Sequence, residues 1–346
     1  MSVRDIQGVG VGGEFEGVGT FKGIVRGPVN AEKIAHVPGT PWIITSGEPS
    51  RSVPYGRLYA VDTRDNSAQE VYPYRSSTRH DPETFGATPD VLDPLVFAPH
   101  GLDVSALEDG SHRLYVVNHG GRQSVEVFDV DLSERSPSLA WRGGVILPRG
   151  TWPNDIAALT DGGFLVSSTV DPDVDGVEGG MARMFDGIES VGAVEWHSEG
   201  GCAAVPGSTM AGANGILVSE DAERIFIGGW RDGNLVRLTR THGSTTVDSI
   251  KLGILVDNLT WSPDGSILAA GAFGTTPSKI YDAFRAGDTC FFPCKVLRID
   301  AETLEISTVL AFDGSTYGLS TTGLVVGHEI WVSSGRAAGI ARFEAE

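Results

Sequence analysis

The segment Asn154-Asp-Ile-Ala-Ala-Leu-Thr-Asp-Gly-Gly-Phe-Leu-Val, residues 154–166, contains the pattern that decides the fold. A polar residue precedes a short apolar run, an acidic and glycine-rich turn follows, and a second apolar run completes the unit. Two apolar runs joined by an Asp-Gly turn are typical of two antiparallel strands. The segment therefore predicts two neighbouring strands of a β-sheet.

The same unit recurs along the chain. Asn214-Gly-Ile-Leu-Val-Ser-Glu-Asp-Ala-Glu-Arg-Ile-Phe-Ile and Asp257-Asn-Leu-Thr-Trp-Ser-Pro-Asp-Gly-Ser-Ile-Leu-Ala repeat it, and looser copies begin at Glu32, His100 and Thr321. The copies are spaced by about 40 to 70 residues, near the ~40–50 residues of a propeller blade with added loop insertions. We therefore predict an all-β fold, a six-bladed β-propeller with four-stranded blades around a central channel.

The outer strands and the turns agree with this fold. Alternation of apolar and polar residues in segments 56–62, 124–130, 234–239 and 295–300 is typical of strands with one buried face. Glycine (46 residues) and proline (18 residues) are scattered between short apolar runs and are not gathered in a linker. A two-sheet sandwich would not require a polar residue at the head of each unit. We expect residues 1–346 to form one domain.

The charge of the chain restricts its partners. The formal net charge is -19 and the isoelectric point is about 4.7. A strongly negative surface repels phosphate backbones and anionic lipid headgroups. We therefore expect neither nucleic acid nor a membrane surface as a partner.

The N-terminus and the cysteines indicate the compartment. Residues 1–8 lack the apolar run of a signal peptide, and no later segment approaches the ~20 apolar residues of a membrane-spanning helix. Cys202, Cys290 and Cys294 are too few for a disulfide framework, although Cys290 and Cys294 could pair with each other. We expect a cytoplasmic protein.

The residues at the heads of the repeats are candidates for a functional site. The first strand of each blade lines the channel of a propeller, so equivalent head positions converge at one end of it. These positions hold Glu32, His100, Asn154, Asn214, the pair Asp257 and Asn258, and either Ser320 or Thr321. Each asparagine alone is more typical of a turn, but a turn does not require the same side chain at the same position of each repeat. Carboxylates and amides without a thiolate favour calcium, which takes about 6 to 8 oxygen ligands.

Several of these positions lie in motifs that resemble a known family. The motifs are Phe97-Ala-Pro-His100-Gly-Leu, Val116-Val-Asn-His119, Pro153-Asn154-Asp155, Gly212-Ala-Asn214-Gly-Ile and Leu255-Val-Asp257-Asn258. In order and context they resemble those of the paraoxonase and arylesterase lactonases, within the senescence-marker/gluconolactonase superfamily. The resemblance runs from about residue 30 to the C-terminus and implies a calcium-dependent lactonase or esterase.

The resemblance also implies roles for individual residues. The ligands of one catalytic calcium ion would be Glu32, Asn154, Asn214, Asp257 and Asn258. His100 and His119 would form a histidine pair beside the metal, with His100 activating water, while His119 either takes part directly or only orients His100.

One position departs from the family pattern. Paraoxonases hold a second, structural calcium ion deep in the channel, and one of its two carboxylate positions is kept here as Asp155 while the other is Lys33. A lysine ammonium there would pair with Asp155 in place of the ion. We therefore expect one catalytic calcium ion per chain and no second one.

The predicted function is hydrolysis of a small-molecule lactone or related ester. The metal would polarise the carbonyl while a histidine activates water. No Gly-x-Ser-x-Gly motif indicates a covalent serine mechanism. Two other functions stay open: a metal-free propeller similar to strictosidine synthase, and a non-catalytic propeller that binds protein partners.

The segment 275–293 is an insertion rich in aromatic residues. Tyr281, Phe284, Phe291 and Phe292 make it a candidate apolar lid, although a surface loop fits its sequence almost as well. The sequence leaves open the identity and stereochemistry of the substrate and the oligomeric state.

Overall fold

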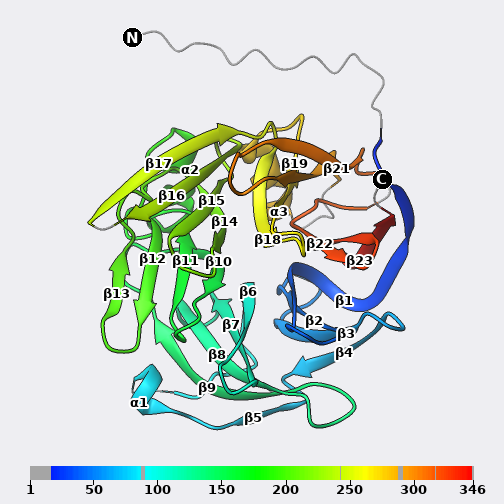
Figure 1. Ribbon diagram of the computed structural model, residues 1–346, viewed down its shortest axis with the longest axis vertical. Helices are drawn as coiled ribbons and strands as arrows, with labels where there is room; N and C mark the ends of the chain where they lie inside the picture. Colours follow the sequence, from blue (N-terminus) through cyan, green and yellow to red (C-terminus); the bar gives the residue numbers. More distant parts are fainter. Residues whose placement is uncertain (1–16, 87–89, 242, 287–290, 316, 345–346) are drawn as a thin grey trace.

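The computed structural model of the chain is an all-β propeller whose sheets surround a central axis (Figure 1). It describes residues 17–86, 90–241, 243–286, 291–315 and 317–344. Strands β1, β6, β10, β14, β18 and β22 contact one another in that order around the axis. The residues that the sequence places at the heads of the repeats therefore lie next to the channel.

Three sheets each consist of four consecutive antiparallel strands. The first contains β10 (Pro153–Ala158), β11 (Phe164–Ser168), β12 (Gly192–His197) and β13 (Gly201–Ala204). The second contains β14 (Ala213–Val218), β15 (Arg224–Gly229), β16 (Asn234–Thr241) and β17 (Ser244–Lys251). The third contains β18 (Leu255–Trp261), β19 (Ile267–Ala272), β20 (Cys294–Ile299) and β21 (Ile306–Phe312). In each, the strand nearest the axis comes first in sequence.

A five-stranded sheet follows the same plan with one addition. Its main strands are β6 (Pro99–Ala106), β7 (His112–Asn118), β8 (Ser124–Asp131) and β9 (Ser138–Ile146). The short strand β5 (Ser76–Thr78) pairs in parallel with the outer edge of β9. Strand β5 belongs to the connection between two sheets. It pairs with the outer edge of β9, which the repeat pattern leaves without a partner.

The two ends of the chain share a single six-stranded sheet. Its order is β22 (Thr322–Val326), β23 (Glu329–Glu344), β1 (Thr20–His36), β2 (Trp42–Gly47), β3 (Arg57–Asp62) and β4 (Ser67–Tyr72). The long strands β1 and β23 lie side by side, and their register shifts near Val29 (Figure 1). The first and last repeats of the sequence are therefore joined in one sheet.

The prediction of six four-stranded blades is wrong. The described residues form five hydrogen-bonded sheets, of four, five or six strands, and hence five blades. The reason lies in β1 and β23, which have 17 and 16 residues and pair with each other on both sides of a register shift near Val29, so that the first and last repeats belong to one sheet. Each sequence repeat corresponds to one inner strand. A blade, in contrast, is defined by backbone hydrogen bonds, which here join segments that are distant in the sequence.

The core lies between neighbouring sheets, where alternating apolar side chains meet. Ile44 and Leu58 of one sheet, for example, pack with Leu102, Leu114 and Phe128 of the next, and all five are fully buried. This packing follows from the period of two along each strand, which directs successive side chains to opposite faces.

Within the described residues, three helices interrupt the strands. They are α1 (Pro82–Phe85), α2 (Gly176–Phe185) and α3 (Pro277–Ala286). The repeat pattern did not predict them, because they lie in the insertions between strands. No helix of the described residues is long and apolar enough to cross a membrane.

Candidate active site

A β-bulge near the start of five inner strands builds the site. In β1, β6, β10, β14 and β18, two residues lie opposite one residue of the second strand of the same sheet. The bulged pairs are Glu32 and Lys33, His100 and Gly101, Asn154 and Asp155, Asn214 and Gly215, and Asp257 and Asn258. Bulges redirect side chains out of the regular alternation. Eight of the nine residues to which the sequence analysis gives a role at the site occupy such a bulge, and the ninth, His119, does not.

Two of the bulged positions are glycines because neighbouring backbone comes close. A Cβ atom on Gly101 would lie 2.4 Å from the carbonyl oxygen of Asn154, and one on Gly215 would lie 2.6 Å from that of Asp257. Any side chain there would separate adjacent inner strands. These glycines therefore allow the ring of inner strands to close tightly below the site.

Six of the predicted site residues line one cavity of about 280 Å³ at the end of the channel. They are Glu32, His100, His119, Asn154, Asn214 and Asp257. Glu32, Asn214 and Asp257 are buried, whereas Asn154 and the two histidines are partly buried. The sequence prediction that these side chains converge agrees with their positions.

Asn258 lies behind this cavity and holds Glu32. Its side-chain nitrogen donates to Glu32 Oε1 at 3.0 Å. The backbone oxygen of Glu32 accepts hydrogen bonds from the hydroxyls of Thr321 (2.6 Å), Thr322 (3.0 Å) and Ser333 (3.0 Å). Thr321, one of the two head residues of the last repeat, thus anchors Glu32 through its hydroxyl.

Three amide oxygens at the site lack a hydrogen-bond donor. These are Oδ1 of Asn154, Asn214 and Asn258, which are buried and have no partner among the described residues. A buried carbonyl oxygen without a partner is costly, so such atoms need an explanation. Three of them together, beside two carboxylates, form a set of oxygen ligands suited to a hard cation.

Burial disfavours the charged forms of two carboxylates at the site. Burial raises the pKa of Glu32 to about 7. Burial, together with the negative charge of Glu32, raises the pKa of Asp257 well above its ordinary value. A cation bound between them would favour their charged forms.

The site residues therefore fit a calcium ion. No three His, Cys, Asp or Glu side chains gather as a metal cluster anywhere in the described ranges. The candidate ligands are instead two carboxylates and neutral amides, a set of donors suited to calcium and not to zinc or a soft metal.

The two histidines are held in fixed positions. The rings of His100 and His119 meet edge to face, with centroids 5.3 Å apart. His119 also stacks on Trp152 at 4.4 Å, and its Nδ1 is 2.7 Å from Gln123 Oε1. His100 Nδ1 makes a short hydrogen bond with the carboxylate of Glu48.

The surroundings of the two histidines shift their pKa values in opposite directions. Burial lowers the pKa of His100, but the Glu48 carboxylate outweighs it and raises this pKa to about 9. Burial would raise the pKa of Glu48, yet His100 and Arg336 lower it to about 2. Burial and the neighbouring His100 lower the pKa of His119 to about 4. A cation held by the nearby carboxylates would oppose protonation of His100, because like charges repel.

Lys33 and Asp155 form an ion pair beneath the ring. Lys33 Nζ lies 2.7 Å from Asp155 Oδ2 and also donates to the carbonyl oxygen of Leu259 at 2.7 Å. The side chains are 4% and 0% exposed. Asp155 Oδ2 accepts a further bond from the backbone N–H of Ile216 at 3.1 Å. Lys33 also lines a separate hollow at the other end of the channel, so the pair lies between the two openings.

The remaining walls of the cavity are mostly apolar. Trp152, Val177, Met181, Trp230, Tyr281 and Phe284 line them. Val177 and Met181 belong to α2, and Tyr281 and Phe284 belong to α3, which is part of the insertion predicted as a lid. The side chains of Tyr281 and Phe284 thus border the site, whereas Phe291 is exposed. Cys290 lies outside the described residues, so its pairing with Cys294 stays a prediction.

The sequence analysis missed two charged residues of the site, Glu48 and Arg336. Glu48 follows the end of β2, as His119 follows β7, and Arg336 lies in β23. The second strand of each sheet runs antiparallel to the first, so it ends where the first begins. Applying the repeat to the ends of second strands would have found Glu48.

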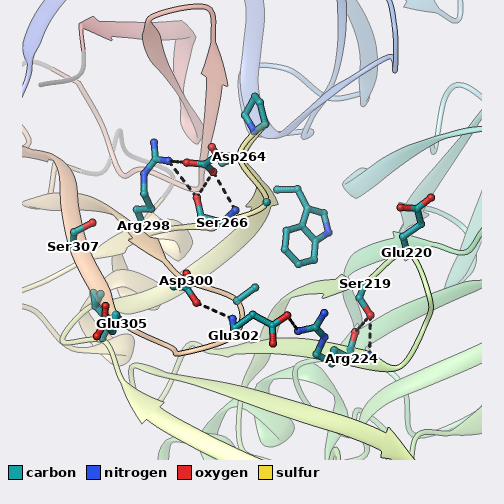
Figure 2. A pocket seen from close by; sticks show the side chains of 16 residues that line it. Ser219, Glu220, Arg224, Asp264, Ser266, Arg298, Asp300, Glu302, Glu305 and Ser307 are labelled. Atoms are coloured by element: carbon teal, nitrogen blue, oxygen red, sulfur yellow. Dashed lines mark hydrogen bonds and ion pairs between the residues drawn. The ribbon is translucent and has the colours of Figure 1, made fainter.

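A larger hollow on the outside of the propeller has a different character. It encloses about 800 Å³ between the sheets of β14–β17 and β18–β21. Figure 2 shows its charges paired with one another: Arg298 with Asp264, and Arg224 with Glu302. None of the predicted site residues lines it. Its size alone does not make it an active site.

The cavity and its ligands can now be compared with known proteins. A family model described as arylesterase matches residues 56–337. This chain belongs to the arylesterase family. It is 26% identical to human serum paraoxonase/lactonase 3 over 230 residues, which are 65% of this chain and 62% of that protein. The match therefore spans less than two thirds of that relative.

Two solved structures share the fold of this chain. The periplasmic gluconolactonase of Pseudomonas aeruginosa has a TM-score of 0.51 and 13% identity, with 95% of each chain covered. A protein provisionally assigned as a gluconolactonase has a TM-score of 0.55 and 13% identity, covering 96% of this chain and 98% of the other. The predicted membership of the paraoxonase and arylesterase family is confirmed by the family model. At 13% identity, the two solved structures support the propeller fold alone.

Proposed function

We propose that this chain is a calcium-dependent hydrolase of lactones or related esters. The ligands of the ion would be Glu32, Asn154, Asn214, Asp257 and Asn258. The observation that supports this best is the set of three buried amide oxygens without donors, placed beside two buried carboxylates whose pKa values are raised by burial. Membership of the arylesterase family supports an ester or lactone substrate.

In the proposed reaction the protein provides both an electrostatic and a proton-transfer site. When bound, calcium would polarise the substrate carbonyl and stabilise the negative charge that develops as water attacks. His100 faces the same cavity and accepts the proton of that water. His119 contacts the edge of His100 and is itself fixed by Gln123 and Trp152, so it limits the rotation of the catalytic ring.

The apolar walls would bind the hydrocarbon part of the substrate. Trp152, Trp230 and Phe284 face the cavity, and burial of apolar surface against them is worth about 25 cal/mol per Å². These walls also exclude water, which strengthens the electrostatic interactions of the ligands with the reacting carbonyl.

The test is a measurement of metal content and activity on the same purified protein. Elemental analysis should find one calcium ion per chain. A panel of lactones and aryl esters should be hydrolysed before chelation, not after it, and again when calcium is returned. Full hydrolysis by protein shown to be metal-free would contradict the proposal, and absence of both calcium and hydrolysis would favour a binding propeller or a metal-free enzyme.

A matched pair of variants connects the activity to this site. Asp257→Asn removes one ligand charge at nearly constant size and should reduce both calcium binding and hydrolysis. Asp264→Asn, in the outer hollow of the same sheet, should change neither. Equal loss in both variants would show a general effect on folding and would contradict the assignment of the site.

A further inference from the structure

Glu48 lines the cavity but is not one of the proposed calcium ligands. Its Oε1 is bonded to His100 Nδ1, and its Oε2 accepts from Arg336 Nη1 at 2.7 Å. Its side chain is 15% exposed. It follows β2 directly, so it reaches the cavity from a second strand and not from an inner strand.

The backbone of Glu48 is held on both sides by Asn30. Glu48 N–H donates to the Asn30 carbonyl oxygen at 3.0 Å, and Asn30 Nδ2 donates to the Glu48 carbonyl oxygen at 3.0 Å. Asn30 has a φ of 52°, in the left-handed region that asparagine tolerates better than most residues. The local backbone therefore adopts an uncommon conformation to keep Glu48 in place.

Arg336, the partner of Glu48, is itself fixed by two further contacts. Its Nη1 also donates to the Gly335 carbonyl oxygen at 2.6 Å, and its guanidinium lies 4.5 Å from the ring centroid of Phe284. An arginine with two fixed contacts leaves little freedom to the carboxylate that it binds. Glu48 is thus fixed at its backbone and at one carboxylate oxygen, with the other oxygen directed to His100.

We propose that Glu48 is a positioning residue that orients His100 and holds its proton on Nδ1. A neutral imidazole carries one proton on either nitrogen, and the partner of one nitrogen decides which. With Nδ1–H donated to Glu48, the other nitrogen, Nε2, keeps its lone pair. Nε2 makes no hydrogen bond to any described residue, so it is free to accept a proton from water in the cavity.

The other neighbours of His100 do not provide this function. His119 contacts it ring edge to ring face, and its own Nδ1 is taken by Gln123. Glu32 is bonded through Oε1 to Asn258 and belongs to the proposed ligand set. Glu48 is the neighbour whose carboxylate is hydrogen-bonded to the His100 ring. The inference about its role rests on the proposed function.

The test compares Glu48→Ala and Glu48→Gln with a control on the same sheet. Glu329 is a suitable control, because it forms a two-bond ion pair with Arg342 at 2.8 and 2.7 Å outside the cavity. With calcium saturating, Glu48→Ala should lower kcat about 10- to 100-fold, the usual loss for a residue that orients a site histidine, with little change in KM. Glu48→Gln keeps an acceptor oxygen and should recover part of this loss, and Glu329→Ala should leave kcat unchanged.

A second measurement separates positioning from general stabilisation. The ¹⁵N shifts of His100, recorded above the pKa of its ring, should show Nδ1–H in wild type and mainly Nε2–H in Glu48→Ala. If Glu48→Ala does not fold, Glu48→Gln and Arg336→Met provide the same readouts. Wild-type kcat with unchanged shifts in any folded Glu48 variant would overturn the proposal.

The two measurements also distinguish this inference from the proposed function. If wild type hydrolyses no ester, the proposed function fails, and the ¹⁵N shifts alone then decide whether Glu48 sets the tautomer of His100. If wild type is active but the shifts do not respond to loss of Glu48, the positioning role fails while the hydrolase assignment stands.

Discussion

The ring of proposed calcium ligands and the ion pair beneath it differ in how their buried polar groups are satisfied, although they are one residue apart in sequence. Glu32 and Asn154 belong to the ring, where amide oxygens lack hydrogen-bond donors and burial raises the pKa of the carboxylates. Lys33 and Asp155 are the next residues, and their charges neutralise each other at 2.7 Å. The comparison suggests that one layer requires an external cation, while the layer below carries its cation on a side chain.

The first prediction concerns the removal of one carboxylate from the ring of proposed ligands. Glu32→Ala should abolish measurable turnover and strongly reduce calcium affinity, because neutral amides with one carboxylate do not hold the ion. The measurements are lactone hydrolysis and calcium titration calorimetry. Glu302→Ala, in the outer hollow, is the control and should behave as wild type. Normal turnover in Glu32→Ala would refute the ligand assignment.

The second prediction separates metal binding from proton transfer. His100→Gln should still bind calcium but lower kcat by about 10² to 10⁴, as expected when a general base is lost. Stopped-flow or steady-state kinetics at saturating calcium would measure this. An unchanged rate would transfer the role of the base to His119 or to a carboxylate of the cavity.

The third prediction concerns the removal of the lysine charge from the ion pair beneath the ring. Lys33→Met should lower the free energy of unfolding by about 3 to 5 kcal/mol, because it leaves Asp155 buried without its counter-charge. Chemical denaturation would measure the loss, with Lys22→Met as control, since Lys22 forms an exposed pair with Glu344.

A double variant sharpens this third prediction. Lys33→Met combined with Asp155→Leu removes both charges, and it should recover much of the stability lost in Lys33→Met alone. If Lys33→Met is as stable as wild type, the ion pair has no structural importance and the comparison of the two layers fails.

The fourth prediction concerns removal of the ion from the intact protein. Because Lys33 supplies the lower charge, chelation should leave the protein folded and remove only the binding contribution, about 2.7 kcal/mol when free calcium is a hundredfold above Kd. Thermal or chemical unfolding with and without EDTA would measure the difference. Unfolding on chelation, or two calcium ions per wild-type chain, would contradict it.

Lys33→Asp extends the same measurement. This variant places two carboxylates in the lower layer and should create a second calcium site, so that its stability becomes more dependent on calcium than that of wild type. A variant that binds one ion and unfolds independently of calcium would show that the lower layer does not accept a cation.

The outer hollow shows why size was a poor guide to the site. It is larger than the central cavity, yet its arginines and carboxylates pair with one another at the surface (Figure 2). The central cavity is smaller but contains buried oxygens without donors. Unsatisfied buried polar groups indicate a site more directly than volume does.

Sequence alone was sufficient for the all-β propeller class and for six of the polar residues that meet in the cavity. Polar residues recurred at the same position of each repeat, and equivalent positions in a propeller lie at equal distance from its axis. That regularity placed Asn154, Asn214 and Asp257 together before any contact was known. The resemblance to paraoxonases implied Lys33 and Asp155 as partners, and the structure places their charged atoms within hydrogen-bond distance.

Only the tertiary structure decided the number of blades and the neighbours of His100. The merging of the first and last repeats depends on backbone pairing between β1 and β23, which are joined by no local pattern. Glu48 reaches His100 because β2 ends beside the start of β6, and Arg336 reaches Glu48 from the other end of the chain. Local sequence repeats determine what each strand presents to the axis, whereas contacts between strands far apart in the chain arise only when the sheets close around it.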